Sequence, residues 1–165
     1  MTEILYGVME FLIGWIAIML SILFHEAGHL SGWKMSSRSK CWRITAGSGK
    51  KLFGAGRISF HLLPFGGTFE ESDEAFPATK KDAVLMCLGG PLFTLILTLA
   101  LFFVQRVIPA DAFGMNIRAR QLVIFVRNYN LILFLITAIP WKYPKFLSPY
   151  PNSDGMAALK YLRDK

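Results

Sequence analysis

The chain has 165 residues, of which 53% are hydrophobic and only 18% are charged, and its mean hydropathy is +0.42. That composition is too apolar for an ordinary soluble domain of this length, so it predicts a membrane protein with a single domain over residues 1–165. The formal charge of +7 would suit a nucleic-acid-binding protein, but no nucleic-acid-binding motif accompanies the basic residues. We therefore expect no nucleic-acid partner.

Three segments are apolar and long enough to cross a bilayer, which takes about 20 residues. They run from about Ile4 to Leu30, from Ala83 to about Val104, and from Leu122 to about Pro140. Between the first two, KCWRITAG and GRISFHLL contain the β-branched and aromatic residues typical of short strands. The predicted fold is an α-helical membrane protein with three transmembrane helices and a short β-hairpin loop between helices 1 and 2.

Lysine and arginine residues concentrate in the loop after the first predicted span and in the tail after the third. Because these residues favour the cytoplasmic side of a membrane, we expect the N-terminus outside and the C-terminus in the cytoplasm. The small size fits an integral protein of a bacterial or archaeal cell membrane. The lipid bilayer is therefore one expected partner.

The first predicted span contains the sequence FHEAGHL, although an ionisable group inside a membrane costs about 2.5–3.5 kcal/mol or more. On a helix, His25 and His29 share one face, whereas Glu26 lies about 100° round the axis from His25. In this HExxH spacing, two neutral imidazoles bind Zn²⁺ and the glutamate acts as general base on a zinc-activated water. The sequence thus predicts His25 and His29 as zinc ligands and Glu26 as the catalytic base.

A zinc ion held by two histidines and a water still has one coordination position for a further protein ligand. Asp154 follows the third span on the expected cytoplasmic side, and Gly155 beside it would allow a sharp backbone turn towards the metal. Asp111 is expected on the opposite side of the membrane, which excludes it. The residues themselves leave further candidates open: His61, Glu70, Glu71, Asp73 and Glu74.

With these residues assembled, the chain resembles the site-2 protease family of intramembrane zinc metalloproteases. The similarity rests on FHEAGHL (24–30), LLPFGGTFEE (62–71), LGGPLFTLILT (88–98) and NSDG (152–155), in the order in which the family has them. The resemblance implies a three-helix metalloprotease core, Zn²⁺ as cofactor and Asp154 as the third ligand. It also implies regulated intramembrane proteolysis, in which a membrane protein or membrane-bound peptide is cleaved in or next to its transmembrane segment.

The chain departs from the family pattern shortly before the Asp-Gly motif. The family commonly has Asn-x-x-Pro there, whereas this sequence has Thr137 before Pro140 and then the additional stretch WKYPKFLSPYP. Thr137 is expected to imitate that asparagine in part during substrate binding. Asn128, Asn130 and Asn152 are possible substitutes.

Two glycine-rich motifs have structural interpretations. Gly66 and Gly67 are expected to form a turn that returns the loop towards the membrane, where they would also contact the substrate. Gly89, Gly90 and Pro91 are typical of close packing between membrane helices, and we favour that role over direct catalysis.

The predicted enzyme is therefore a zinc metalloendopeptidase. The alternative is a non-catalytic membrane protein of the same fold that acts as a binding partner or scaffold. Glu26 favours the enzyme, because metal binding alone does not require a base at that position.

Overall fold

The computed structural model describes residues 2–37, 39–71, 79–107, 117–144 and 151–163. Its elements follow in the order α1 (Thr2–Lys34), β1 (Trp42–Ala55), β2 (Ile58–Glu71), α2 (Lys80–Val107), α3 (Ile117–Ala138) and α4 (Asp154–Arg163). Within this described part, α1, α2 and α3 are long and apolar enough to cross a membrane, judged by length and composition. The three predicted spans are thus confirmed as helices, and α4 is an addition that the sequence did not predict.

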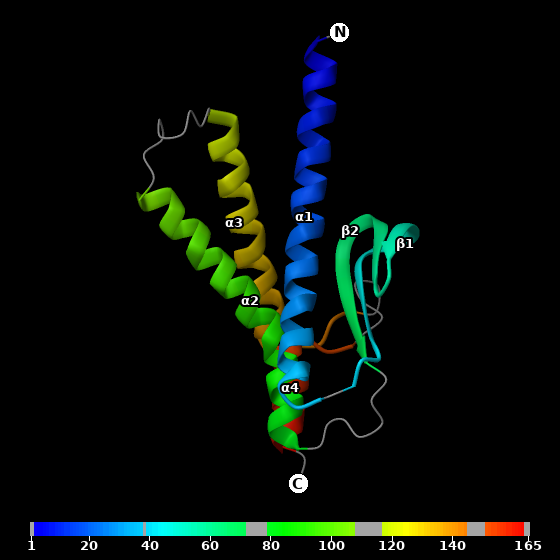
Figure 1. Cartoon of the computed structure of the whole chain (residues 1–165). Coiled ribbons are helices and arrows are strands. Elements are labelled where there is room, and N and C mark those ends of the chain that lie inside the picture. Colours follow the sequence, from blue (N-terminus) through cyan, green and yellow to red (C-terminus); the bar gives the residue numbers. More distant parts are fainter. Residues whose placement is uncertain (1, 38, 72–78, 108–116, 145–150, 164–165) are drawn as a thin grey trace.

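The first helix, α1, is longer than a bilayer requires. Its 33 residues extend about 50 Å at 1.5 Å per residue, compared with a hydrocarbon core about 30 Å thick. Figure 1 shows its N-terminal part standing clear of the other elements, and there Ile4 and Phe11 are 75% and 71% exposed. Such exposed apolar side chains are the surface expected to face lipid.

The helices α1 and α2 touch backbone to backbone. A Cβ atom on Gly28 would lie 2.3 Å from the carbonyl oxygen of Gly89, and one on Gly32 would lie 2.3 Å from that of Leu85. Real Cβ atoms do not approach an oxygen so closely, so each of these positions on α1 requires glycine. The packing role predicted for Gly89 is confirmed, and Gly28 and Gly32 form a GxxxG pair on the face of α1 that contacts α2.

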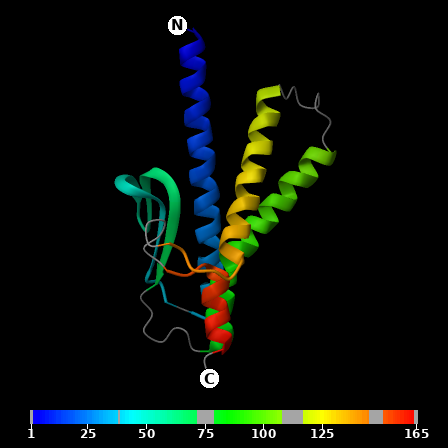
Figure 2. The same cartoon turned by 180° about the vertical axis from the view of Figure 1, so that it is seen from behind.

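Figures 1 and 2 show that α2 lies against α1 at one end and diverges from it, together with α3, towards the other. The buried residues of α2 recur at helical spacing and so mark one inner face. They include Ala83, Cys87, Gly90, Thr94 and Thr98.

The hairpin formed by β1 and β2 is longer than predicted, because each strand has 14 residues. The strands pair antiparallel with repeated register shifts, and Ile44 lies opposite both Phe69 and Ile58. Gly47 and Gly49 explain the difference. Sequence patterns treat such glycines as the ends of strands, but here their positive φ values of 82° and 78° let β1 bend and continue.

The hairpin lies along the side of α1, not beyond its end (Figures 1 and 2). The Trp15 indole donates a hydrogen bond to the carbonyl oxygen of Leu62 at 3.0 Å, and the Trp33 ring meets the edge of the Phe69 ring at 5.8 Å. A small core between α1 and β1 is formed by Met19, Ile22 and Ala46. The HExxH motif lies between Trp15 and Trp33 in α1, so this part of the helix runs beside the hairpin.

The third helix, α3, ends just before Pro140, because proline has no N–H group to continue the helical ladder. The carbonyl oxygen of Ile136, four residues earlier, instead accepts hydrogen bonds from Trp141 Nε1 at 2.7 Å and from the Tyr143 hydroxyl at 3.1 Å. The two aromatic side chains thus supply the hydrogen-bond donors that the Ile136 carbonyl oxygen lacks because Pro140 has no N–H group.

The described residues at the two ends of the additional stretch, 141–144 and 151–153, lie next to each other. Lys142 and Asn152 form an antiparallel bridge, and the Ser153 N–H donates to the carbonyl oxygen of Trp141 at 3.1 Å. Because these two ends pair with each other, the additional residues do not carry Asp154 away from α3.

Candidate metal centre

Three ligand atoms converge where α1 meets the start of α4. His25 Nε2 lies 3.2 Å from His29 Nε2 and 3.2 Å from Asp154 Oδ2, and His29 Nε2 lies 3.5 Å from the same carboxylate oxygen. A tetrahedral zinc ion with bonds of about 2.0–2.2 Å holds its ligand atoms roughly 3.3–3.6 Å apart. The spacing of the three predicted ligands therefore fits such an ion.

His29 is oriented by α2. Its Nδ1 donates a hydrogen bond to the carbonyl oxygen of Met86 at 2.8 Å, so Nε2 is the ring nitrogen that faces the centre and could bind a metal through its lone pair. His25 Nδ1 is buried and has no hydrogen-bond partner among the described residues. Of the two imidazoles, that of His29 is thus the more firmly held.

Gly90 of α2 faces both imidazoles. A Cβ atom at this position would lie 2.4 Å from His29 Nε2 and 2.7 Å from His25 Nε2. The missing side chain keeps open the space beside the ligand atoms. The packing predicted for Gly90 is therefore a contact with the two histidines predicted to bind the metal, which the sequence did not indicate.

Ser153 fixes the start of α4 and was missed by the sequence analysis. Its Oγ accepts hydrogen bonds from the backbone N–H groups of Met156 at 3.2 Å and Trp141 at 3.1 Å, and it donates to the carbonyl oxygen of Ile139 at 2.7 Å. The side chain is completely buried. As the N-cap of α4, Ser153 ties the first residue of that helix, Asp154, to the end of α3.

Gly155 has a different role from the predicted turn. It lies within α4, and a Cβ atom there would be 1.9 Å from the carbonyl oxygen of Ala138, so glycine allows α4 to approach α3 closely. Burial raises the pKa of Asp154, but the nearby imidazoles of His29 and His25 outweigh it and lower that pKa below the usual range. Asp154, the predicted third ligand, is therefore a carboxylate at neutral pH.

Glu26 lies beside the ligand triad without belonging to it, and its side chain is buried. Gly67 packs against it, because a Cβ atom there would be 2.6 Å from Glu26 Oε1. The neighbouring Gly66 has a φ of 68°, a left-handed conformation that glycine adopts without strain. Both glycines lie inside β2 instead of in the predicted turn, since the strand must pass close to this carboxylate.

The two polar residues of α3 predicted to bind substrate lie buried in or against helices. The Asn130 amide donates to Ser21 Oγ of α1 at 2.9 Å and to the carbonyl oxygen of Val126 at 2.8 Å. The Thr137 hydroxyl donates to the carbonyl oxygen of Leu133 at 2.8 Å. Their roles in substrate binding stay predictions.

The other candidates for the third ligand do not reach the histidines in the part of the chain that the structure describes. His61 Nδ1 is hydrogen-bonded to the carbonyl oxygen of Gly49 at 2.8 Å within the hairpin. Glu70 and Glu71 belong to β2 and are not part of the triad. The remaining candidates, Asp73 and Glu74, lie outside the described residues, as does Asp111, which the sequence analysis excluded.

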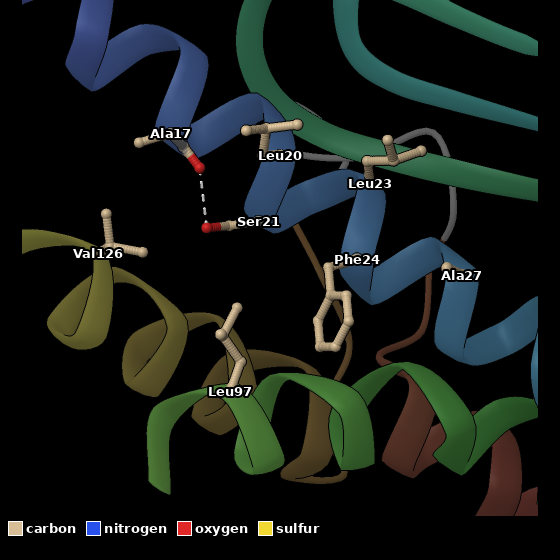
Figure 3. A pocket seen from close by; sticks show the side chains of 8 residues that line it. All are labelled: Ala17, Leu20, Ser21, Leu23, Phe24, Ala27, Leu97 and Val126. Atoms are coloured by element: carbon tan, nitrogen blue, oxygen red, sulfur yellow. Dashed lines mark hydrogen bonds between the residues drawn. The ribbon is translucent and has the colours of Figure 1, made fainter. Parts of the chain in front are cut away.

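An apolar groove of about 510 Å³ opens between α1 and the pair α2 and α3. Figure 3 shows Ser21 and Phe24 reaching from α1 towards this space and Leu97 reaching in from α2. The metal ligands do not line the groove, but Phe24 is the neighbour of His25 in the sequence. The groove therefore borders the turn of α1 that holds the first ligand.

No curated protein matches the sequence. The sequence model of Peptidase family M50 matches residues 13–152, a range that contains His25, Glu26 and His29 and ends just before Asp154. This family is the site-2 protease family, so the resemblance inferred from the four motifs is confirmed. Because the match covers most of the chain, and the buried triad has the spacing of a metal site, the chain belongs to peptidase family M50, a family of metalloproteases.

Proposed function

We propose that this protein is a zinc endopeptidase that hydrolyses a peptide bond in or next to the transmembrane segment of a membrane protein or membrane-bound peptide. The proposal rests on the convergence of Asp154, from α4, with His25 and His29 of α1. Glu26 follows His25 in α1, which is a helix apolar enough to cross a membrane. Burying an ionisable side chain inside a membrane-spanning helix costs free energy, so such side chains are usually retained for a function. Membership of a metalloprotease family supports hydrolysis as that function.

Zinc suits the donor set, because two imidazole nitrogens and one carboxylate oxygen are typical zinc ligands and leave one tetrahedral position open. Bound zinc supplies a Lewis acid that lowers the pKa of its water from 15.7 to about 7. The residues of the chain hold and orient the ion: the Met86 carbonyl fixes the ring of His29, and Asp154 offsets part of the positive charge.

Glu26 is suited to move protons. It follows His25 directly and lies outside the ligand triad, so its carboxylate is free of metal coordination. During hydrolysis this carboxylate accepts a proton from the attacking water and later donates it to the leaving amine. Its contact with Gly67 places the general base next to β2.

A transmembrane substrate must unwind locally before it is cut, because the amides of a helix are satisfied internally. The strand β2 is suited to hold the unwound segment, since it passes Glu26 and could add an extended peptide to its edge by backbone hydrogen bonds. The apolar groove along Ala17, Ser21 and Phe24 supports access from lipid, because its lining is almost entirely hydrocarbon.

We further propose that the protein lies in a bacterial or archaeal membrane with its N-terminus outside and its C-terminus in the cytoplasm. The distribution of lysine and arginine residues supports this orientation. In that arrangement the metal centre lies towards the cytoplasmic side, because His25 and His29 are in the last third of α1.

The decisive experiment compares the unmodified protein with Glu26→Gln in the same cells. New N-termini in the membrane fraction are identified by mass spectrometry, and the zinc content of each purified protein is measured. We expect cuts in or beside transmembrane segments that are absent with Glu26→Gln, and equal zinc content in both proteins, because Glu26 is not a ligand. Glu10→Gln, an identical chemical change in the exposed part of α1, is the matched control and should cut normally.

Two outcomes would contradict the proposal. If Glu26→Gln produces the same cuts as the unmodified protein, Glu26 is not the general base. If neither protein produces cuts although both bind zinc, the chain is a non-catalytic metal-binding protein of this fold.

A further inference from the structure

A second cavity lies between the C-terminal part of α2 and the N-terminal part of α3. Figures 1 and 2 show these parts of the two helices at the opposite end from α4. The volume of the cavity is about 340 Å³. The side chains that line it are Phe102, Gln105, Arg106, Arg120, Ile124 and Arg127. None of them lines the apolar groove or belongs to the metal triad, so the cavity is a separate feature of the molecule.

The cavity is strongly basic. Among the residues that the structure describes, three of the six lining side chains are guanidinium groups, and none of these six is acidic. The Arg106 guanidinium lies over the Phe102 ring at 5.4 Å, and Arg127 donates a hydrogen bond to Gln105 Oε1 at 2.5 Å. Like charges around a small volume repel one another, so an anion between them is favourable. Guanidinium groups also match the oxygens of a phosphate in geometry.

Gln105 offers a further donor to such an anion. Its Oε1 accepts the hydrogen bond from Arg127, whereas its Nε2 is buried and has no partner among the described residues. A buried amide donor without an acceptor is unfavourable. A phosphate oxygen in the cavity that Gln105 lines would supply that acceptor.

The position of the cavity favours a lipid as the source of the phosphate. Arg106 is near the end of α2 and Arg120 near the start of α3. The backbone of Arg127 lies about 10 Å, or two turns, further along α3, but its guanidinium group reaches Gln105, the residue before Arg106. The apolar side chains of Phe102 and Ile124 line the same cavity. A phospholipid has this layout, with a phosphate at the membrane surface and acyl chains beneath it.

We propose that this cavity binds the phosphate group of an anionic phospholipid. The guanidinium groups of Arg106, Arg120 and Arg127 contact the phosphate oxygens, and an acyl chain follows Phe102 and Ile124. The bound lipid then holds the ends of α2 and α3 together at the side of the membrane away from the metal centre.

The test is the double variant Arg106→Gln, Arg120→Gln in the purified full-length protein. Both residues are exposed, and Arg127 is left unchanged because it joins α3 to α2. The control, Lys160→Gln with Arg163→Gln, removes the same charge from exposed positions of α4. Thermal unfolding in detergent is followed by tryptophan fluorescence while phosphatidylglycerol, phosphatidylcholine or inorganic phosphate is titrated.

We expect phosphatidylglycerol to raise the unfolding temperature of the unmodified protein and the control more than phosphatidylcholine does. Its apparent affinity for the double variant should be at least about tenfold weaker, because two charge-assisted contacts are lost. Equal stabilisation of the double variant and the unmodified protein would overturn the proposal, as would an equal effect of phosphatidylcholine. If inorganic phosphate alone reproduces the full shift, the ligand is free phosphate and the lipid assignment is wrong.

Discussion

Replacing Gly90 by alanine is the most direct perturbation of the metal centre, because the new methyl group would lie among the ligand atoms. It would be 2.4 Å from His29 Nε2 and 2.7 Å from His25 Nε2. Non-bonded contacts of this kind are comfortable at about 3.5 Å, so the imidazoles would have to retreat by roughly 1 Å. Bond lengths in a metal site vary by only about 0.2 Å. The two imidazoles therefore cannot both keep their bonds to one ion.

The same change leaves the helix itself intact. Alanine is more favourable than glycine inside a helix by about 0.8–1.0 kcal/mol, which offsets part of the roughly 1–3 kcal/mol that overpacking a buried site costs. The metal-free variant should therefore lose at most about 2 kcal/mol in unfolding free energy. Gly89→Ala is different, because its methyl group would lie 2.1 Å from the backbone carbonyl oxygen of Gly28 and push α1 from α2. Gly14→Ala is the neutral control, since nothing lies within 4 Å of its Cβ position.

The assay measures zinc affinity by competition with a chromophoric chelator, together with the unfolding temperature of the metal-free proteins. We expect Gly90→Ala to bind zinc at least about 100-fold more weakly, which is the upper end of the effect seen when residues around metal ligands are changed. Its unfolding temperature should fall by less than about 8 °C, and Gly14→Ala should match the unmodified protein in both measurements. A Gly90→Ala protein that binds zinc with unchanged affinity would refute the arrangement described for the centre.

Two further substitutions test the surroundings of the triad. Ser153→Ala removes the cap of α4, so we expect a loss of about 1–2 kcal/mol in unfolding free energy and weaker zinc binding, whereas Ser31→Ala, at an exposed helical serine, should change neither. Unchanged zinc affinity in Ser153→Ala would show that the cap does not hold Asp154. Gly67→Ala places a methyl group 2.6 Å from Glu26 Oε1, so proteolysis should fall at least about tenfold while zinc content stays the same. Loss of zinc from Gly67→Ala would contradict the separation of base and ligands.

The three long helices could be predicted because a run of apolar residues is a local signal. The first predicted span, from about Ile4 to Leu30, falls within the observed helix Thr2–Lys34. The hairpin was underestimated because its strands bend at glycines with positive φ, such as Gly47, and such bends depend on pairing with distant residues. Strand propensity describes single segments, so it stopped at these positions.

The candidate site residues also fall into two groups, those that a local motif predicts and those that depend on contacts between distant segments. His25, Glu26 and His29 form one local motif, and its spacing together with its place in an apolar span was enough to predict them as site residues. Asp154 required the family resemblance, because 129 positions separate it from His25 along the chain. Gly90 could not be assigned to the ligands from the sequence, since its position depends on how α2 packs against α1. Two signals were nevertheless present: the GxxxG pair in α1, and a serine directly before the first residue of α4.

That packing sets the geometry of the metal centre. The backbone contact between Gly28 and Gly89 fixes the position of α2 along α1. Met86 and Gly90 lie on either side of Gly89 in α2, so the same contact brings the Met86 carbonyl to His29 and the bare Cα of Gly90 to both imidazoles. The HExxH motif supplies the ligand atoms, but α2 determines how one ring is turned and how much room remains beside it.

The additional stretch before the Asp-Gly motif shows why a departure from the family pattern need not disturb the ligands. Asp154 is placed by contacts of its neighbours with the end of α3, namely Ser153 Oγ with the carbonyl oxygen of Ile139 and Gly155 with that of Ala138. These contacts do not depend on how many residues lie between the two helices, because the ends of the intervening stretch pair with each other. The length of that stretch can therefore vary while the distance from the carboxylate to the histidines on α1 is kept.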